Sequence, residues 1–358
     1  MSEEANLLHA IVEQPEDDGV RLVYADWLEE HGRPERADFI RLQIELARLP
    51  MDDPRRLDLE ERLSENGKRP PPTDRLTPPR LDARPCFVTG RQADWRRELP
   101  SLPGIIWGAF WRGFVAEAWV KNWKTLRTQA ETMFASAPVE RLTLEQLTTR
   151  TAVTLANWPG LARLHVLDIR GNDIGPDGVR ALAESVHTSN LTALNLRSAD
   201  GGPEGAAALA ASPYLARLTG LDLWENYIGD QGAAALAGSP QLTNLTELVL
   251  NENQIGPEGM TSLARSRYLT RLTELYLYQN PIGDVGAEAL AASEAFATLR
   301  TLRVLAADIG DAGAKALAAS PHLGGLQMLD LRFNADIGPW AAERLRLRFA
   351  DRVFLGNG

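Results

Sequence analysis

The chain has 358 residues, with 48 acidic and 38 basic side chains and a formal net charge of −10. A negative field of this kind repels phosphate backbones, so nucleic acid is disfavoured as a partner. The single cysteine, Cys86, cannot form an internal disulfide, which fits a reducing compartment. No apolar run approaches the roughly 20 residues that span a bilayer, and the acidic start does not resemble a signal peptide. We therefore expect a cytoplasmic protein that does not cross a membrane.

Residues 1–65 are predicted to form a small all-α domain. Apolar side chains recur at intervals of three and four between residues 5 and 50, which is the period of an amphipathic helix. Gly32 and Pro34 interrupt this pattern. Three short helices are expected here.

Residues 66–104 are predicted to be a linker or an N-terminal cap. Six prolines between residues 70 and 85 disfavour regular helices and central strands. Eight basic and four acidic side chains between residues 66 and 99 give this stretch a net charge of +4. Two interpretations stay open: a solvated linker, or an anchor for an acidic partner or for the acidic remainder of this chain.

Residues 105–358 are predicted to be a repeat domain, with strict 27-residue repeats from 164 to about 345. Each repeat reads L-x-x-L-x-L-x-x-N-x-I-G-x-x-G-x-x-x-L-A-x-S. The leucines that open the copies are Leu164, Leu191, Leu218, Leu245, Leu272, Leu299 and Leu326. The alternating leucines predict a short strand, and the following Gly- and Ala-rich half predicts a helix.

One repeat cannot bury its own leucines, so neighbouring repeats must stack into a parallel sheet with helices outside. Strands lie about 4.8 Å apart whereas packed helices need about 8 to 10 Å, so strands should line a concave face and helices a convex one. Asparagines at the end of each strand are expected to form a structural ladder along the stack. These are Asn172, Asn226, Asn253, Asn280 and Asn334, with alanine instead at 199 and 307.

The repeated phrase resembles the leucine-rich-repeat family, closest to the ribonuclease-inhibitor-like class, and the fold implied is an α/β solenoid, or horseshoe. At the N-terminus, residues 24–30 (YADWLEE) and 36–43 (RADFIRLQ) resemble the repeat-companion domain that precedes leucine-rich repeats in some bacteria. The two resemblances together imply a bacterial protein in which a helical companion domain precedes the solenoid.

The register of the repeats also predicts which side chains leave the concave face. Aromatic and acidic residues concentrate on the repeats that begin at Leu218, Leu245 and Leu272. Exposed Trp and Tyr on a rigid sheet are typical of interface hot spots, and acidic neighbours favour a partner with a basic surface. The predicted partner-binding residues are Asp222, Trp224, Glu225, Glu247, Asn251, Glu252, Glu274, Tyr276 and Tyr278. The alternative is that these aromatic side chains only cover neighbouring strands.

No set of catalytic residues is recognisable. The five histidines are scattered without metal-ligand spacing, and neither a cofactor nor a metal is expected. We therefore expect a non-enzymatic scaffold for protein interaction. The alternative is a regulator of an enzyme, either an inhibitor or a GTPase-activating protein that uses Arg170 or Arg197. An enzyme in its own right is the least favoured class, and the sequence leaves the oligomeric state open.

Overall fold

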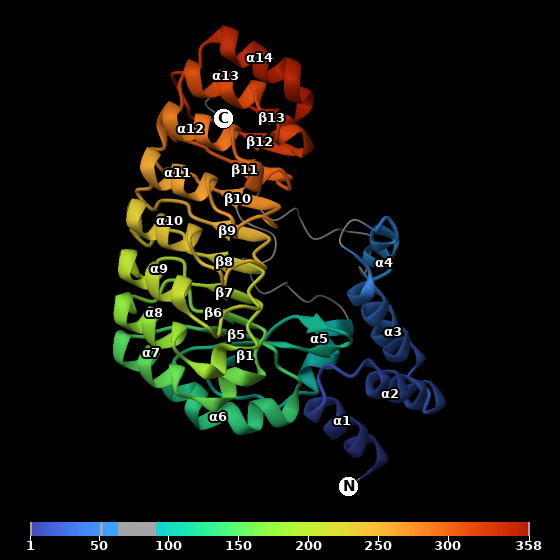
Figure 1. Ribbon diagram of the computed structural model, residues 1–358. Coiled ribbons are helices and arrows are strands. Elements are labelled where there is room, and N and C mark those ends of the chain that lie inside the picture. Colours follow the sequence, from blue (N-terminus) through green and yellow to red (C-terminus); the bar gives the residue numbers. More distant parts are fainter. Residues whose placement is uncertain (1, 51–52, 64–90, 357–358) are drawn as a thin grey trace. The chain divides into compact units, whose positions relative to one another are not determined.

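The computed structural model describes residues 2–50, 53–63 and 91–356 (Figure 1). The chain divides into two compact units, Met1–Leu144 and Glu145–Gly358. Most of the proline- and arginine-rich segment, including Cys86, lies outside the described residues, so neither interpretation of that segment is tested. Its last part is α5 (Arg91–Arg97), a helix in a stretch without proline between Pro85 and Pro100.

The three predicted N-terminal helices are present as α1 (Glu3–Glu13), α2 (Asp18–Glu30) and α3 (Pro34–Arg48), and α4 (Arg55–Leu63) follows them. Side chains cap the first two of these helices. Ser2 accepts a hydrogen bond from the Ala5 N–H at the start of α1, and Asp17 accepts one from the Gly19 N–H at the start of α2.

The N-terminal helices and the first strands share one core. Strands β1 (Ile105–Trp107), β4 (Glu117–Val120) and β5 (Arg141–Leu144) lie side by side, with α6 (Trp123–Ser136) between β4 and β5 in sequence. A short hairpin, β2 (Phe110–Trp111) and β3 (Phe114–Val115), projects toward the helices. Phe114 packs with Ile11, Tyr24, Leu28 and Ile40, so the hairpin is part of the helical core.

The second unit repeats strand, turn and helix. Its strands β6 to β13 form a parallel array in which leucines 27 residues apart are neighbours, such as Leu221 and Leu248. The strands are β6 (Val166–Asp168), β7 (Ala193–Asn195), β8 (Gly220–Asp222), β9 (Glu247–Val249), β10 (Glu274–Tyr276), β11 (Thr301–Arg303), β12 (Met328–Asp330) and β13 (Val353–Phe354). The helices are α7 (Thr149–Ala156), α8 (Gly175–Ala183), α9 (Gly202–Ala211), α10 (Gly229–Ala237), α11 (Pro257–Ala264), α12 (Gly283–Ala291), α13 (Asp311–Ala319) and α14 (Pro339–Phe349).

Figure 1 shows these strands in one layer and the helices in another. The leucines of both layers are buried between them, as at Leu221, Leu223 and Leu236. This confirms the predicted α/β solenoid for the second unit. We call the side of β6 to β12 that faces away from the helices the strand face.

Asparagine side chains join consecutive repeats. Asn253, which is fully buried, accepts hydrogen bonds from the N–H groups of Asn226 and Ile228 at 3.1 and 3.3 Å and donates to Leu223 O at 2.7 Å. Asn280 makes the same set of bonds one repeat later. A side chain that satisfies backbone groups of the preceding repeat sets the spacing between that repeat and its own.

Alanine interrupts this ladder at two places, and the backbone changes there. Where Ala307 follows Asn280, the Ile282 N–H donates to the Asn280 carbonyl at 2.7 Å. Where Ala199 follows Asn172, the Ile174 N–H donates to the Asn172 carbonyl at 2.8 Å. In other repeats the corresponding Ile N–H donates to the Asn side chain of the next repeat. At the two alanines a local turn supplies a backbone carbonyl instead.

On the helix side, aspartates cap the helix of the following repeat. Helices α9 to α14 have no side-chain cap from their own N-cap residue. Asp284 in α12 accepts hydrogen bonds from the N–H groups of Gly310 and Gly313, both at 2.8 Å, at the start of α13. Asp230 does the same for α11, at 2.7 and 2.9 Å. A Cβ atom at Gly313 would lie 2.8 Å from Asp284 Oδ1, so this position suits glycine.

Candidate partner-binding surface

Strands β6 to β12 are in register, and each is three residues long. Their side chains therefore form columns across the strand face. Residues 222, 249 and 276 end three adjacent strands and are paired in register. Residues 224, 251 and 278 lie two positions beyond these strand ends, where the Trp224 ring packs against Tyr278 and the Tyr278 N–H donates to Asn251. The structure brings the predicted partner-binding residues of three repeats onto one patch.

Burial divides the predicted residues into two groups. Asp222, Glu247, Asn251 and Tyr276 are buried, whereas Trp224, Glu225, Glu252, Glu274 and Tyr278 are partly exposed. Tyr276 is only 4% exposed, so the expectation that it faces solvent is wrong. Its hydroxyl donates to Glu274 at 2.6 Å, and the Arg303 guanidinium lies 6.0 Å from its ring centroid. Tyr276 is therefore buried among its neighbours on the strand face.

The partly exposed centre of the patch is a set of four side chains that we call the Trp224 cluster: Arg197, Trp224, Glu252 and Tyr278. The Arg197 guanidinium lies over the Trp224 ring, 3.6 Å from its centroid. The indole N–H donates to Glu252 Oε1 at 3.0 Å, and the Tyr278 ring packs edge-on at a centroid distance of 6.5 Å. Stacking and hydrogen bonding hold the indole in one orientation before any partner arrives.

The patch carries less negative charge than its sequence predicts. Burial raises the pKa of the Asp222 carboxyl to about 7, while a hydrogen bond from the Trp224 N–H at 2.9 Å and the charge of Arg197 oppose this rise. Asp222 is therefore partly protonated near neutral pH. The acidic side chains that remain partly exposed, Glu225, Glu252 and Glu274, each accept a hydrogen bond from a neighbouring side chain.

Ion pairs flank the Trp224 cluster on both sides. Arg332 contacts Asp330 at 2.7 Å, and the buried Arg303 contacts the same carboxylate at 3.3 Å. Toward the first repeats, Arg170 pairs with Asp168. These pairs were not predicted from the sequence, although the Asp-x-Arg spacing at 168 and 330 was a usable signal. Arg170 and Arg197, the arginines that a GTPase-activating role would use, are thus held by Asp168 and Trp224.

In the part of the chain that the structure describes, no helix combines the length and apolar character needed to cross a membrane.

Comparison with known proteins identifies the repeats. Residues 163–183, 241–264, 268–291 and 297–318 match the family model described as leucine-rich repeat. These four segments are leucine-rich repeats. Each segment contains one strand and the helix that follows it, namely β6 with α8, β9 with α11, β10 with α12, and β11 with all but the last residue of α13. The match and the observed strand-turn-helix units therefore coincide. Among curated proteins, none matches the chain.

Two solved structures share local similarity with the chain. One is the complex of Rad7 and Elc1 from yeast, at 18% identity and a TM-score of 0.42, covering 63% of this chain and 64% of that one. The other is an internalin from Listeria monocytogenes, at 18% identity and a TM-score of 0.36, covering 62% of this chain and 61% of that one. The chain thus spans less than two thirds of either structure.

Proposed function

We propose that the leucine-rich repeats form a non-enzymatic scaffold that binds a partner protein on the strand face, with the Trp224 cluster at the centre of the interface. The observation that carries this proposal is a partly exposed tryptophan fixed by Arg197 and Glu252. Trp, Tyr and Arg dominate interface hot spots. Trp and Tyr bury a large area for little loss of conformational entropy. A side chain that is already ordered loses less entropy on binding.

The chemistry at the edge of the cluster supports a partner with a basic surface. Glu225, Glu252 and Glu274 are partly exposed next to Trp224 and Tyr278, so an incoming Lys or Arg would meet carboxylates around an aromatic centre. We also propose a cytoplasmic location, which the single cysteine favours.

The test uses the full chain as bait in an extract of its source organism, followed by measurement of the dissociation constant with each purified partner. The double variant Trp224→Ala, Tyr278→Ala should weaken binding by about 30-fold, corresponding to about 2 kcal/mol. Its unfolding temperature should change little, because both side chains are partly exposed. The control is Trp340→Ala, which removes a tryptophan that is 57% exposed on α14. A partner that binds the double variant and the wild type equally refutes the strand-face site.

A further inference from the structure

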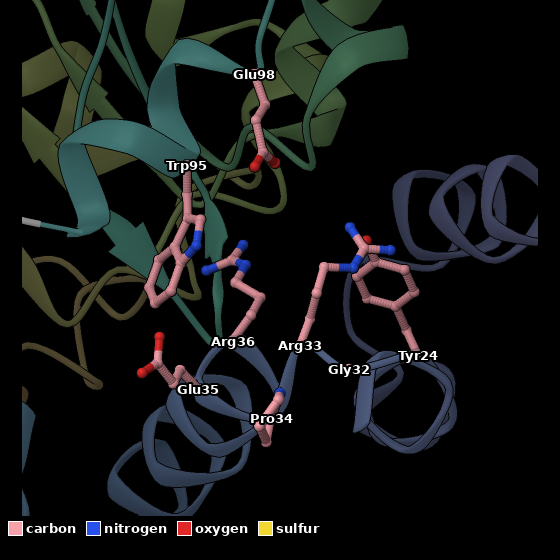
Figure 2. A pocket seen from close by; sticks show the side chains of 8 residues that line it. All are labelled: Tyr24, Gly32, Arg33, Pro34, Glu35, Arg36, Trp95 and Glu98. Atoms are coloured by element: carbon pink, nitrogen blue, oxygen red, sulfur yellow. The ribbon is translucent and has the colours of Figure 1, made fainter. Parts of the chain in front are cut away.

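The first unit contains a pocket that the strand-face proposal does not use. It has a volume of about 400 Å³, within the usual range for ligand sites, and lies between the turn joining α2 to α3 and helix α5 (Figure 2). Its lining residues are Tyr24, Gly32, Arg33, Pro34, Glu35, Arg36, Trp95 and Glu98. Residues 32 to 35 on its rim are exposed, so the mouth is open to solvent.

Arg36 is the unusual side chain of this pocket. Its guanidinium lies 4.4 Å from the centroid of the Trp95 ring, and 5.4, 5.2 and 5.5 Å from those of Phe39, Phe110 and Phe114. Arg36 Nη1 is buried, and it has no hydrogen-bond partner among the described residues. Burial lowers the pKa of Arg36 to about 10. The group nevertheless remains charged at neutral pH, so the fold keeps a partly buried cation next to four aromatic rings.

Two other arginines form ion pairs with carboxylates: Arg33, the N-cap residue of α3, and Arg41 within α3. Arg33 pairs with Glu4 at 2.7 Å, and Arg41 pairs with Asp26 and Glu29 at 2.7 Å each. Within the described ranges, no carboxylate forms an ion pair with Arg36. The Glu98 carboxylate acts on Arg36 through its charge alone. The buried Nη1 therefore lacks a hydrogen-bond acceptor, and a carboxylate that enters the pocket would supply one.

The geometry of Arg36 selects the kind of anion. The guanidinium packs against Trp95, and Figure 2 shows it directed into the space beneath Glu98. Stacking occupies a face of the planar group and leaves its edge for an acceptor, and a carboxylate matches that edge with two oxygens. Glu35 and Glu98 line the same pocket, so a monoanion is repelled less than a phosphate dianion.

We propose that this pocket binds the carboxylate side chain of an acidic peptide segment through Arg36, with Trp95 as the platform beneath the guanidinium. The open rim formed by residues 32 to 35 lets a longer chain continue past the mouth of the pocket. This site is separate from the Trp224 cluster, and its ligand has the opposite charge to the partner expected there.

The test is fluorescence anisotropy with the full chain and the peptide Gly-Ser-Glu-Gly-Ser, which is amidated at its C-terminus and carries an uncharged fluorophore, so that Glu holds its only carboxylate. Replacing Glu in the peptide with Gln should weaken binding at least about tenfold, as loss of a charge-assisted hydrogen bond predicts. Arg36→Gln should cause a similar loss, whereas Arg41→Gln, which removes an arginine outside the pocket, should cause none. The strand-face double variant Trp224→Ala, Tyr278→Ala should bind the peptide normally, which separates this site from the proposed function.

Arg36→Gln could weaken the fold because Arg36 packs against aromatic side chains, so a second variant tests the same inference. Glu98 is exposed and lines the pocket. Glu98→Gln removes a negative charge that repels the Glu side chain of the peptide. It should tighten binding of the Glu peptide by about two- to fivefold and leave the Gln peptide unchanged. Equal binding of the two peptides, or no effect of Glu98→Gln, overturns the proposal. Tighter binding of a phosphoserine peptide would instead indicate a phosphate site. If free glutarate displaces the Glu peptide and binds as tightly as the peptide does, the pocket is a site for a small molecule.

Discussion

The aspartate caps between repeats lead to a quantitative prediction for Asp284. This carboxylate accepts two backbone N–H groups at the start of α13, both at 2.8 Å. Asp284→Ala leaves both donors without that acceptor, and loss of a helix cap or of a charged hydrogen bond typically costs about 1 to 2 kcal/mol. We expect Asp284→Ala to lower the free energy of unfolding by about 2 kcal/mol. Asp284→Asn, which keeps an oxygen but loses the charge, should lower it by only about 0.5 kcal/mol.

Urea unfolding followed by circular dichroism measures this loss. With a slope of about 3 kcal/mol per molar urea, Asp284→Ala should lower the midpoint by about 0.7 M. The matched control is Glu258→Ala, which removes an exposed acid from the first turn of α11 and should cost about 0.5 kcal/mol or less. Faster hydrogen exchange at the Gly310 and Gly313 amides would locate the effect. Equal midpoints for Asp284→Ala and Glu258→Ala would refute the capping role.

Two further predictions concern buried polar groups. The pKa of Asp222, raised to about 7 from 3.8, means that the folded chain keeps a proton that the unfolded chain releases, so wild-type stability falls as pH rises from about 4 to about 7. The free energy of unfolding of Asp222→Asn should therefore exceed that of wild type at pH 8 by on the order of 4 kcal/mol, and the two should converge near pH 4; a constant difference across this range contradicts the assignment. Asn253→Ala removes three hydrogen bonds to the preceding repeat and should cost about 3 kcal/mol in urea unfolding, whereas a loss below about 1 kcal/mol would show that water replaces the amide.

The repeat pattern was enough to predict the arrangement of strands and helices in the second unit. A fixed 27-residue period restricts every copy to the same geometry, so leucines such as Leu221 and Leu248 become neighbours. Exposure on the strand face was less predictable. Each strand there is only a few residues long, and the exposure of Tyr276 depends on Glu274 and on Arg303 of the next repeat. The period indicates the direction of a side chain but not the contacts of its neighbours.

The capping aspartates and the Arg36 pocket were harder to foresee for different reasons. Asp230 and Asp284 occupy a position at which other repeats have proline, as at Pro257, so the variation was visible, but its function depends on the spacing between adjacent helices. The pocket joins residues 24 to 36 with Trp95 and Glu98, which are separated by about 60 residues in the sequence. No local pattern indicates that pairing.

The two alanines in the asparagine ladder have a consequence for cooperativity. In stacked repeats, stability is a sum of repeat terms and nearest-neighbour terms, so weak interfaces divide the array into blocks that open separately. Between Ala199 and Ala307 the ladder is uninterrupted. The repeats there form one block, because Asn226, Asn253 and Asn280 each link two consecutive repeats. Trp224 and Tyr278 both lie within it. The outer repeats could therefore fray at either end while the surface around Trp224 keeps its shape, and amide exchange in the chain should be slowest in this central block.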